Sequence, residues 1–295
     1  MKQQPFFLSS LLVVHSFNLI AQPNKYEGLF GRSRDQPHEI RRESTYHVSP
    51  KSEVNIYAVV VGVGQYTAMQ PLRYTGDDAR LFYTHLQSAQ GGALPENQIV
   101  LLLEQDATHR NISQALRLMS QRADENDVIV FYFSGHGLNR SFLPIDFDGF
   151  QNQLSHEEVF RILQNSRAQH KLCIADACHS GALDYTADLA SKGNFSSSTS
   201  TLYQEYERAQ SGIALLMSSR AGEASLEDRS LRQGVFTYFL LRGMSGTADY
   251  NIDGIVNIKE LFHYVSHKVK EYTYGAQSPW LSGDYDDDMP VSIGE

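Results

Sequence analysis

The chain has 295 residues, of which 41% are hydrophobic and 20% charged, so it can form one large domain or two small ones and does not have the composition of disordered protein. Its 25 Lys and Arg residues against 34 Asp and Glu residues give a net charge of −9, which argues against nucleic acid as a partner. The two cysteines, Cys173 and Cys178, are too few for a disulfide framework or a four-cysteine zinc site.

The beginning of the chain has the pattern of an export signal over residues 1–21. Lys2 precedes the largely apolar run Phe6–Ile20, and a small residue follows that run. We therefore expect an exported protein, periplasmic or secreted, and the alternative is a cytoplasmic protein with an apolar N-terminal strand. Residues 22–54 are polar, which predicts a linker or pro-segment. No apolar run is long enough to span a bilayer, so we expect no stable membrane anchor.

From residue 55 onward, short apolar runs alternate with stretches of helical spacing. The runs are typical of parallel strands that are buried on both faces, and they cover Ile56–Val63, Ile99–Leu103, Val128–Phe133, Leu172–Ala175 and Ile213–Met217. Helices are predicted over Asp77–Gln90, Asn111–Ala123, Ser155–Gln164 and Phe236–Arg242. This alternation predicts an α/β sandwich around a mostly parallel sheet.

Two predicted strands are each followed by a turn that contains a reactive residue and glycine. His136 follows one strand in the sequence Ser-Gly-His-Gly, and Cys178 follows another in Asp-Ala-Cys-His-Ser-Gly. Functional groups of an open parallel sheet gather beyond the carboxyl ends of its strands, so these two side chains are expected to meet. A histidine beside a cysteine can take its proton and make it a nucleophile.

Each residue alone has a simpler explanation, His136 as a strand-end histidine and Cys178 as a small buried side chain. Their joint occurrence in matching turns favours a catalytic pair. The backbone N–H groups of Gly137 and Cys178 are then candidates for binding an oxyanion. Cys173 lies inside an apolar run and is expected in the core.

The two motifs together resemble the caspase-type cysteine peptidases, and within them the metacaspase and paracaspase branch. The stretches VVVGVGQY, YTGDDA and GVFTYFLLRG also resemble blocks of that family. The resemblance implies a three-layer α/β/α sandwich with about six strands over residues 55–295. It also implies a large-subunit region 55–183, a linker 184–211 and a small-subunit region 212–295. The linker is polar and rich in serine, which predicts an exposed loop.

The same resemblance implies an acidic pocket for Arg or Lys, in contrast to caspases, which cut after Asp. Its residues match Asp176, Asp78 and the wall residue Ser134. Paired carboxylates can accept a guanidinium fork through charge-assisted hydrogen bonds. The alternative for Asp77 or Asp78 is that it caps the helix that begins there.

Two glutamates and two basic residues are further candidates for a role in the enzyme. Glu223 and Glu227 follow the fifth predicted strand and are candidates for lining the same cleft. Basic specificity would permit self-cleavage in the linker after Lys192 or Arg208.

A stretch near the C-terminus fits the twelve-residue EF-hand calcium loop at every ligand position. The oxygen ligands would come from Asp249, Asn251, Asp253, Ile255, Asn257 and Glu260. A tight polar turn explains the same residues, with Asn257 as the helix cap and Glu260 completing a capping box. The acidic residues at 284–288 are expected to be solvated surface.

The sequence therefore predicts a cysteine endopeptidase that acts on proteins or peptides with a basic residue before the cleaved bond. The chemistry requires no cofactor, and calcium is the ion that the loop would take. One alternative is a catalytically silent caspase-like calcium-binding or scaffold protein, which would be expected to lack the Cys or the His. The other is a peptidase similar to legumains and gingipains.

Overall fold

The computed structural model describes residues 53–138, 140–177, 199–220 and 222–294. All of them belong to one compact unit, residues 50–295. Several predictions fall outside the described residues. These are the export signal, nearly all of the linker 22–54, Cys178 and Lys192. Within the described part of the chain, no helix is both long and apolar enough to cross a membrane.

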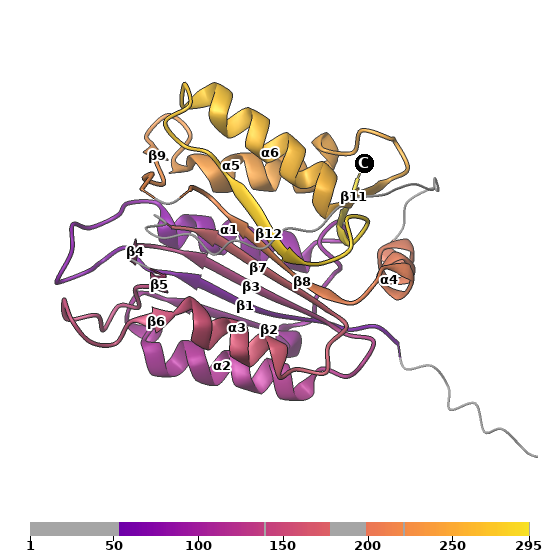
Figure 1. Ribbon diagram of the computed structural model, residues 1–295, viewed down its shortest axis with the longest axis horizontal. Helices are drawn as coiled ribbons and strands as arrows, with labels where there is room; N and C mark the ends of the chain where they lie inside the picture. The colour runs from indigo at the N-terminus through magenta and orange to yellow at the C-terminus, as the bar shows by residue number, and fades with distance from the viewer. Residues whose placement is uncertain (1–52, 139, 178–198, 221, 295) are drawn as a thin grey trace, which may run out of the picture. The chain divides into compact units, whose positions relative to one another are not determined.

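Six strands form one sheet in the order β12-β8-β7-β3-β1-β2, and all neighbours are parallel except β12 with β8. Their bounds are β1 Ile56–Gly62, β2 Ile99–Leu103, β3 Val128–Ser134, β7 His170–Asp176, β8 Gly212–Met217 and β12 Trp280–Asp284. The prediction of a mostly parallel sheet of about six strands is confirmed (Figure 1).

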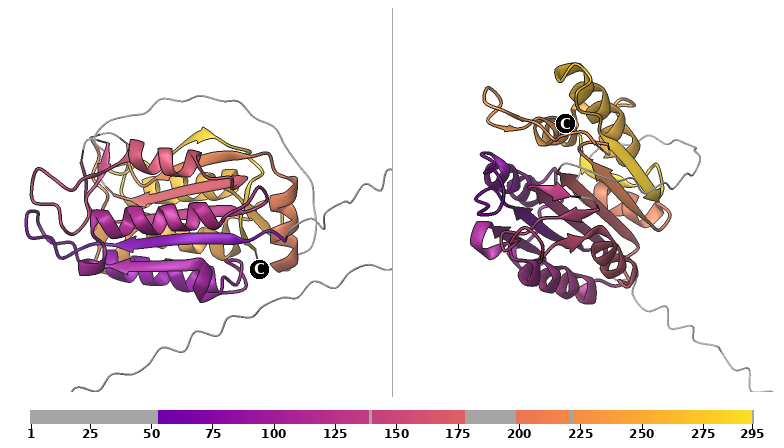
Figure 2. Two further views of the ribbon diagram at one scale, coloured as in Figure 1. Left: turned by 90° about the horizontal axis from the view of Figure 1, so that it is seen from below. Right: turned by 60° about the vertical axis from the view of Figure 1, so that its left-hand side comes forward.

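Helices cover both faces of this sheet (Figure 1). One face carries α2 and α3, and the other carries α1, α5 and α6; Figure 2 shows the same layers from two other sides. The bounds are α1 Thr75–Gln87, α2 His109–Arg122, α3 His156–Gln164, α5 Val235–Arg242 and α6 Ile258–Tyr272. The protein is therefore an α/β/α sandwich, as predicted.

The central strand β3 explains why these runs are apolar throughout. All seven of its residues are buried. Tyr132 packs into the core under α1, α5 and α6, whereas Phe131 and Phe133 pack into the core under α2 and α3. Because successive side chains point to opposite faces, a strand covered on both faces needs apolar residues at every position.

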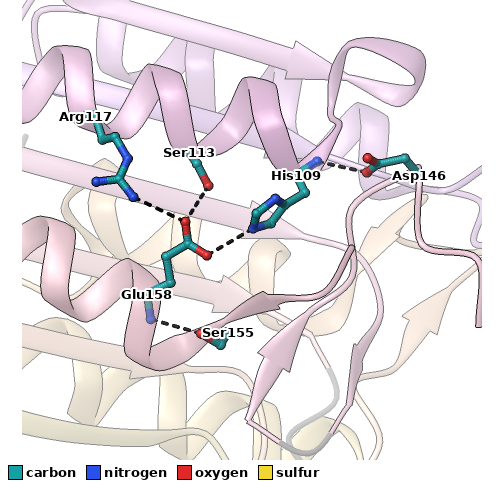
Figure 3. Close-up of polar contacts among 6 residues, drawn as sticks. All are labelled: His109, Ser113, Arg117, Asp146, Ser155 and Glu158. Atoms are coloured by element: carbon teal, nitrogen blue, oxygen red, sulfur yellow. Dashed lines mark hydrogen bonds and ion pairs between the residues drawn. The ribbon is translucent and has the colours of Figure 1, made fainter. Parts of the chain in front are cut away.

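A polar cluster joins α2 to α3 (Figure 3). Ser155 caps α3 by accepting from the backbone N–H of Glu158 at 3.0 Å. The Glu158 carboxylate turns away from the cap and accepts from His109 Nε2 at 3.0 Å and from Ser113 Oγ at 2.9 Å. Arg117 adds an ion pair to it at 3.5 Å. Glu158 therefore ties two helices together instead of completing the local capping pattern.

Several short strands were not predicted. They form three small sheets: β4 Gly137–Leu138 with β5 Ser141–Phe142 and β6 Leu154–Ser155; β9 Glu227–Asp228 with β10 Gln233–Gly234; and β11 Ile255–Asn257 with β13 Pro290–Ile293. Strands of two to four residues contain too few positions to show a periodicity.

The expectation of an exposed loop over 184–211 is wrong for its second half. Residues Thr199–Arg208 form helix α4, whose Leu202 and Tyr206 are buried in the core. Tyr203 Oη donates to the Gly92 carbonyl at 2.7 Å, and His170 Nε2 donates to the Tyr206 carbonyl at 2.7 Å. Contacts made by a few apolar side chains therefore hold a segment whose composition is that of a loop. Helix α4 lies at the end of the sheet opposite β4 and β5 (Figures 1 and 2).

If α4 is docked in this way, Leu202→Ala should lower the free energy of unfolding by about 3 kcal/mol, because a fully buried side chain is lost and a cavity remains. Gln204→Ala, on the exposed side of the same helix, should change it by less than about 0.5 kcal/mol. Urea denaturation followed by circular dichroism measures both. Equal effects from the two substitutions would show that α4 is not packed on the core.

Candidate active site

The candidate site lies where neighbouring strands β3 and β7 end. The two strands pair in register up to Ser134 opposite Asp176, so His136 and Cys178 each follow the last pair by two residues. The last described residue before Cys178 is Ala177. The loop that precedes α1 and the hairpin between β5 and β6 project from the same end of the sheet (Figure 1).

His136 is held by contacts on its backbone and on its ring. Its Nε2 lies 2.7 Å from the carbonyl oxygen of Gln70. Because a carbonyl oxygen can only accept, Nε2 carries a proton, and Nδ1 is the nitrogen left to exchange one. The backbone N–H of His136 donates to Tyr66 Oη at 3.0 Å, and that hydroxyl donates to the Leu143 carbonyl at 2.7 Å. The imidazole is therefore fixed in position and in tautomer.

The residues on either side of His136 have different structural roles. A Cβ atom on Gly135 would lie 2.6 Å from Tyr66 Oη, so a larger residue there would displace the tyrosine that holds His136. Gly137 begins β4 and pairs with Phe142 of β5, and the Leu143 N–H donates to the His136 carbonyl at 3.0 Å.

The backbone just before Cys178 is fixed by a residue that was not singled out in the sequence. Ser218 is fully buried at the end of β8, the next strand of the sheet. Its Oγ accepts from the Ala177 N–H at 3.1 Å and donates to the Ala177 carbonyl at 3.1 Å. A polar residue at the carboxyl end of a third apolar strand is the signal that could have identified it.

Asp78 and Asp176 meet in a pocket beside His136. Both are buried, with 1% and 5% of their surfaces exposed. The pocket is lined by Leu72, Thr75, Asp78, Ser134, Gly135, His136, Asp176, Ser225, Leu226, Glu227 and Gly234. A Cβ atom on Gly234 would collide with the Asp176 carboxylate and lie 3.0 Å from Asp78 Oδ2. The predicted pocket residues Asp78, Asp176 and Ser134 are therefore brought together.

The two carboxylates are bonded to different degrees. Asp176 accepts from the Ser225 hydroxyl and from both the N–H and the hydroxyl of Thr237, at 3.1 and 2.7 Å. Asp78 accepts from the Gly234 N–H at 3.1 Å and weakly from Ser134 Oγ at 3.4 Å. Asp78 therefore retains more capacity to accept hydrogen bonds from a ligand.

Burial and mutual repulsion disfavour ionisation of this pair. Loss of solvent, followed by the charge of Asp176, raises the pKa of Asp78 well above its ordinary value. Loss of solvent also raises the pKa of Asp176, opposed by hydrogen bonds from Ser225 and Thr237. A pocket of this kind holds negative charge at a cost in free energy, and a bound cation would reduce that cost.

The two glutamates named as candidates for the cleft differ. Glu227 lines the pocket, but its carboxylate accepts from the backbone N–H groups of Arg73 and Tyr74, at 3.0 and 2.7 Å, and so holds the start of α1. Glu223 is not among the pocket residues, and its carboxylate accepts from the Ser278 N–H at 2.7 Å.

Neither aspartate caps α1. The N-cap residue is Tyr74, without a side-chain cap bond, and Asp77 is exposed. The capping alternative for Asp78 is thereby removed, since its carboxylate faces Gly234.

The predicted calcium loop lies far along the chain, before α6. Asn257 and Glu260 form a complete capping box at the start of that helix. Asp249 accepts from the N–H groups of Ile252 and Gly254 within the loop, at 2.8 and 2.9 Å. Among the described residues, no group of three or more His, Cys, Asp or Glu side chains is arranged to hold a metal ion. The capping alternative accounts for Asn257 and Glu260, and calcium binding stays a prediction.

Comparison with known proteins identifies the fold and the family. Residues 56–289 match the family model described as the caspase domain. A solved structure of a protein from Geobacter sulfurreducens aligns with 82% of this chain and 100% of its own length, with a TM-score of 0.53 and 15% sequence identity, a likeness of fold.

Three curated relatives are similar over part of the chain. A probable protease of a Desulfuromonadales bacterium is 31% identical over 147 residues, 41% of this chain and 18% of its own length. Metacaspase-4 of Arabidopsis thaliana is 27% identical over 43% of this chain and 34% of its own length. Metacaspase-1 of Eremothecium gossypii is 27% identical over 47% and 35%. The chain thus spans about a third or less of the length of these relatives.

Replacing Asp78 by Asn should stabilise the fold at neutral and alkaline pH. Folding raises the pKa of the Asp78 carboxyl. Such a group favours the folded state at pH values below its pKa in the unfolded chain, and this stabilisation is lost as the pH rises through its pKa in the folded protein. The melting temperature of Asp78→Asn minus that of wild type should therefore be positive at pH 8, by about 2–4 °C per kcal/mol, and should shrink toward pH 4. Thermal denaturation across this range measures it.

Asp77→Asn is the matched control, because the neighbouring Asp77 is exposed and forms a long ion pair with Arg80 at 3.7 Å. It should leave the melting temperature nearly unchanged. A destabilised Asp78→Asn protein at pH 8 would contradict the cost assigned to the carboxylate pair.

Proposed function

The chain belongs to the caspase domain family, and we propose that it is a cysteine endopeptidase that cleaves peptide bonds after Arg or Lys. The observation that carries the proposal is the register of β3 and β7. It ends the two strands side by side at Ser134 and Asp176, two residues before His136 and Cys178. The curated relatives are a probable protease and two metacaspases, which supports a peptidase.

In the proposed reaction His136 Nδ1 takes the proton of the Cys178 thiol, and the thiolate so formed attacks the carbonyl carbon of the cleaved bond. The tetrahedral oxyanion accepts hydrogen bonds from the backbone N–H groups of Gly137 and Cys178. His136 gives its Nδ1 proton to the leaving amine, and the C–N bond breaks to leave a thioester. Water, losing a proton to His136, then attacks the thioester and releases the acid and the thiol. No metal ion takes part in these steps.

The proposed specificity for Arg or Lys is supported by the charge of the pocket. Asp78 and Asp176 are buried beside His136, and Glu227 is part of the same lining. A guanidinium or ammonium group entering there would pair with Asp78, whose carboxylate has unused acceptor positions. An acidic side chain would meet two carboxylates, which disfavours cleavage after Asp.

Fluorogenic peptides ending in Arg, Lys or Asp provide the direct test of this function. Wild-type protein should hydrolyse the Arg and Lys peptides and leave the Asp peptide uncut. Cys178→Ala and His136→Ala should each lower kcat/KM by about a thousandfold or more, because the two groups act as one unit. His263→Ala, at an exposed position on α6, should retain wild-type activity.

Cleavage of the Asp peptide would refute the assigned specificity while keeping the Cys–His pair. Hydrolysis that survives in Cys178→Ala would refute the nucleophile. A folded wild-type protein that cleaves none of the three peptides would favour the scaffold alternative.

Self-cleavage after Lys192 is a further part of the proposal, and the structure argues against the other site named, Arg208. Arg208 ends α4, and the Ala209 that follows is 6% exposed, with its carbonyl accepting from Gln169 Nε2 at 2.9 Å. A peptidase would have to unwind this segment before it could bind the bond.

Mass spectrometry of active wild-type protein should therefore find a cut after Lys192 and none after Arg208. Lys192→Gln and Cys178→Ala should both remain single chains. Fully active wild-type protein that remains one chain, or is cut after Arg208, would contradict this prediction. Export and calcium binding stay predictions of the sequence.

A further inference from the structure

A buried carboxamide outside the pocket holds one of its walls. Gln277, between α6 and β12, is fully buried. Its Nε2 donates to the Ser218 carbonyl at 3.0 Å and to Ser225 Oγ at 3.2 Å. Its Oε1 accepts from the Leu226 N–H at 3.1 Å. Both ends of the amide are therefore engaged, and they join the end of β8 to the segment that lines the pocket.

These bonds fix the direction of the Ser225 hydroxyl. A hydroxyl group has one hydrogen, and because the Gln277 amide donates to the Ser225 oxygen, that hydrogen remains for the Asp176 carboxylate. The other Asp176 oxygen has a similar arrangement, since Tyr132 Oη lies 2.7 Å from Thr237 Oγ1, which in turn donates to Asp176 at 2.7 Å. Each Asp176 oxygen therefore accepts from a hydroxyl group whose own oxygen accepts a hydrogen bond, from Gln277 in one case and from Tyr132 in the other.

We propose that Gln277 is a positioning residue for the pocket that takes the basic side chain. It acts through Ser225, whose hydroxyl it directs to Asp176, and through the backbone of Leu226. Gln277 is fully buried and is not among the pocket-lining residues, so its role is exerted through its neighbours. The inference rests on the proposed function, because it names what shapes the basic-residue pocket of that enzyme.

Two substitutions in the full-length protein separate the bonds. Gln277→Met removes all three, and Gln277→Glu keeps an acceptor for the Leu226 N–H while losing both donors. Each should raise KM for an Arg peptide about tenfold while kcat stays within about threefold, because the loss falls on substrate binding. If Gln277→Met does not fold, Gln277→Glu alone decides the outcome.

Gln169→Met is the matched control. Gln169 Nε2 donates to the Ala209 carbonyl at 2.9 Å, just before β7 begins and so at the end of that strand opposite the pocket. Its loss should lower the melting temperature and leave KM unchanged. A Gln277 variant that behaves like this control, with wild-type KM, would overturn the proposal.

A double-mutant cycle with Ser225→Ala tests the route of the effect. If Gln277 acts through Ser225, Gln277→Met should add little to the KM of Ser225→Ala, and additive changes in log KM would refute that route.

Binding of argininamide to Cys178→Ala, measured by calorimetry, separates this inference from the proposed function. If wild type cleaves no Arg peptide and Cys178→Ala binds no argininamide, the proposed function fails. If both occur and adding Gln277→Met leaves the argininamide affinity unchanged, only the positioning role fails. About a tenfold weaker affinity would support it.

Discussion

Strands β1, β3, β7 and β8 pair in parallel, and their registers bring their carboxyl ends together at one end of the sheet. The candidate site is built at that end. Ser134 and Asp176 are opposite each other in the register. Ser218, directly after β8, reaches back to bond both backbone groups of Ala177. Because the β3–β7 register sets these positions, a shift of one residue between those two strands would displace the proposed nucleophile from its base.

The two carboxylates of the pocket, Asp78 and Asp176, are almost completely shielded from water. The fold contains this charge by surrounding Asp176 with three donors and by keeping a glycine, Gly234, where any side chain would collide with Asp176. Groups arranged for binding a ligand commonly reduce the stability of the free protein, and this pair fits that pattern. The cation proposed to bind there would supply the charge that the fold itself lacks.

Much of the fold could be predicted because buried parallel strands are continuously apolar, and His136 and Cys178 could be found because each follows such a strand. Helix α4 could not be predicted, since Leu202 and Tyr206 are isolated among polar residues. Strand β12 was also missed, because Trp280–Asp284 contains Ser, Gly and Asp on an edge. The roles of Ser218 and Gln277 depend on partners 41 to 59 residues away in the chain, which no local pattern reveals.

The direct pairing of β7 with β8 bears on how a processed form would look. These strands flank the segment that contains Lys192, yet they are hydrogen-bonded neighbours from His170–Gly212 to Ala175–Met217. Helix α4, which follows that segment in the chain, packs on the core through Leu202 and Tyr206. A chain cut after Lys192 would keep its native mass and hydrodynamic radius in solution, and its two polypeptides would separate only under denaturing conditions.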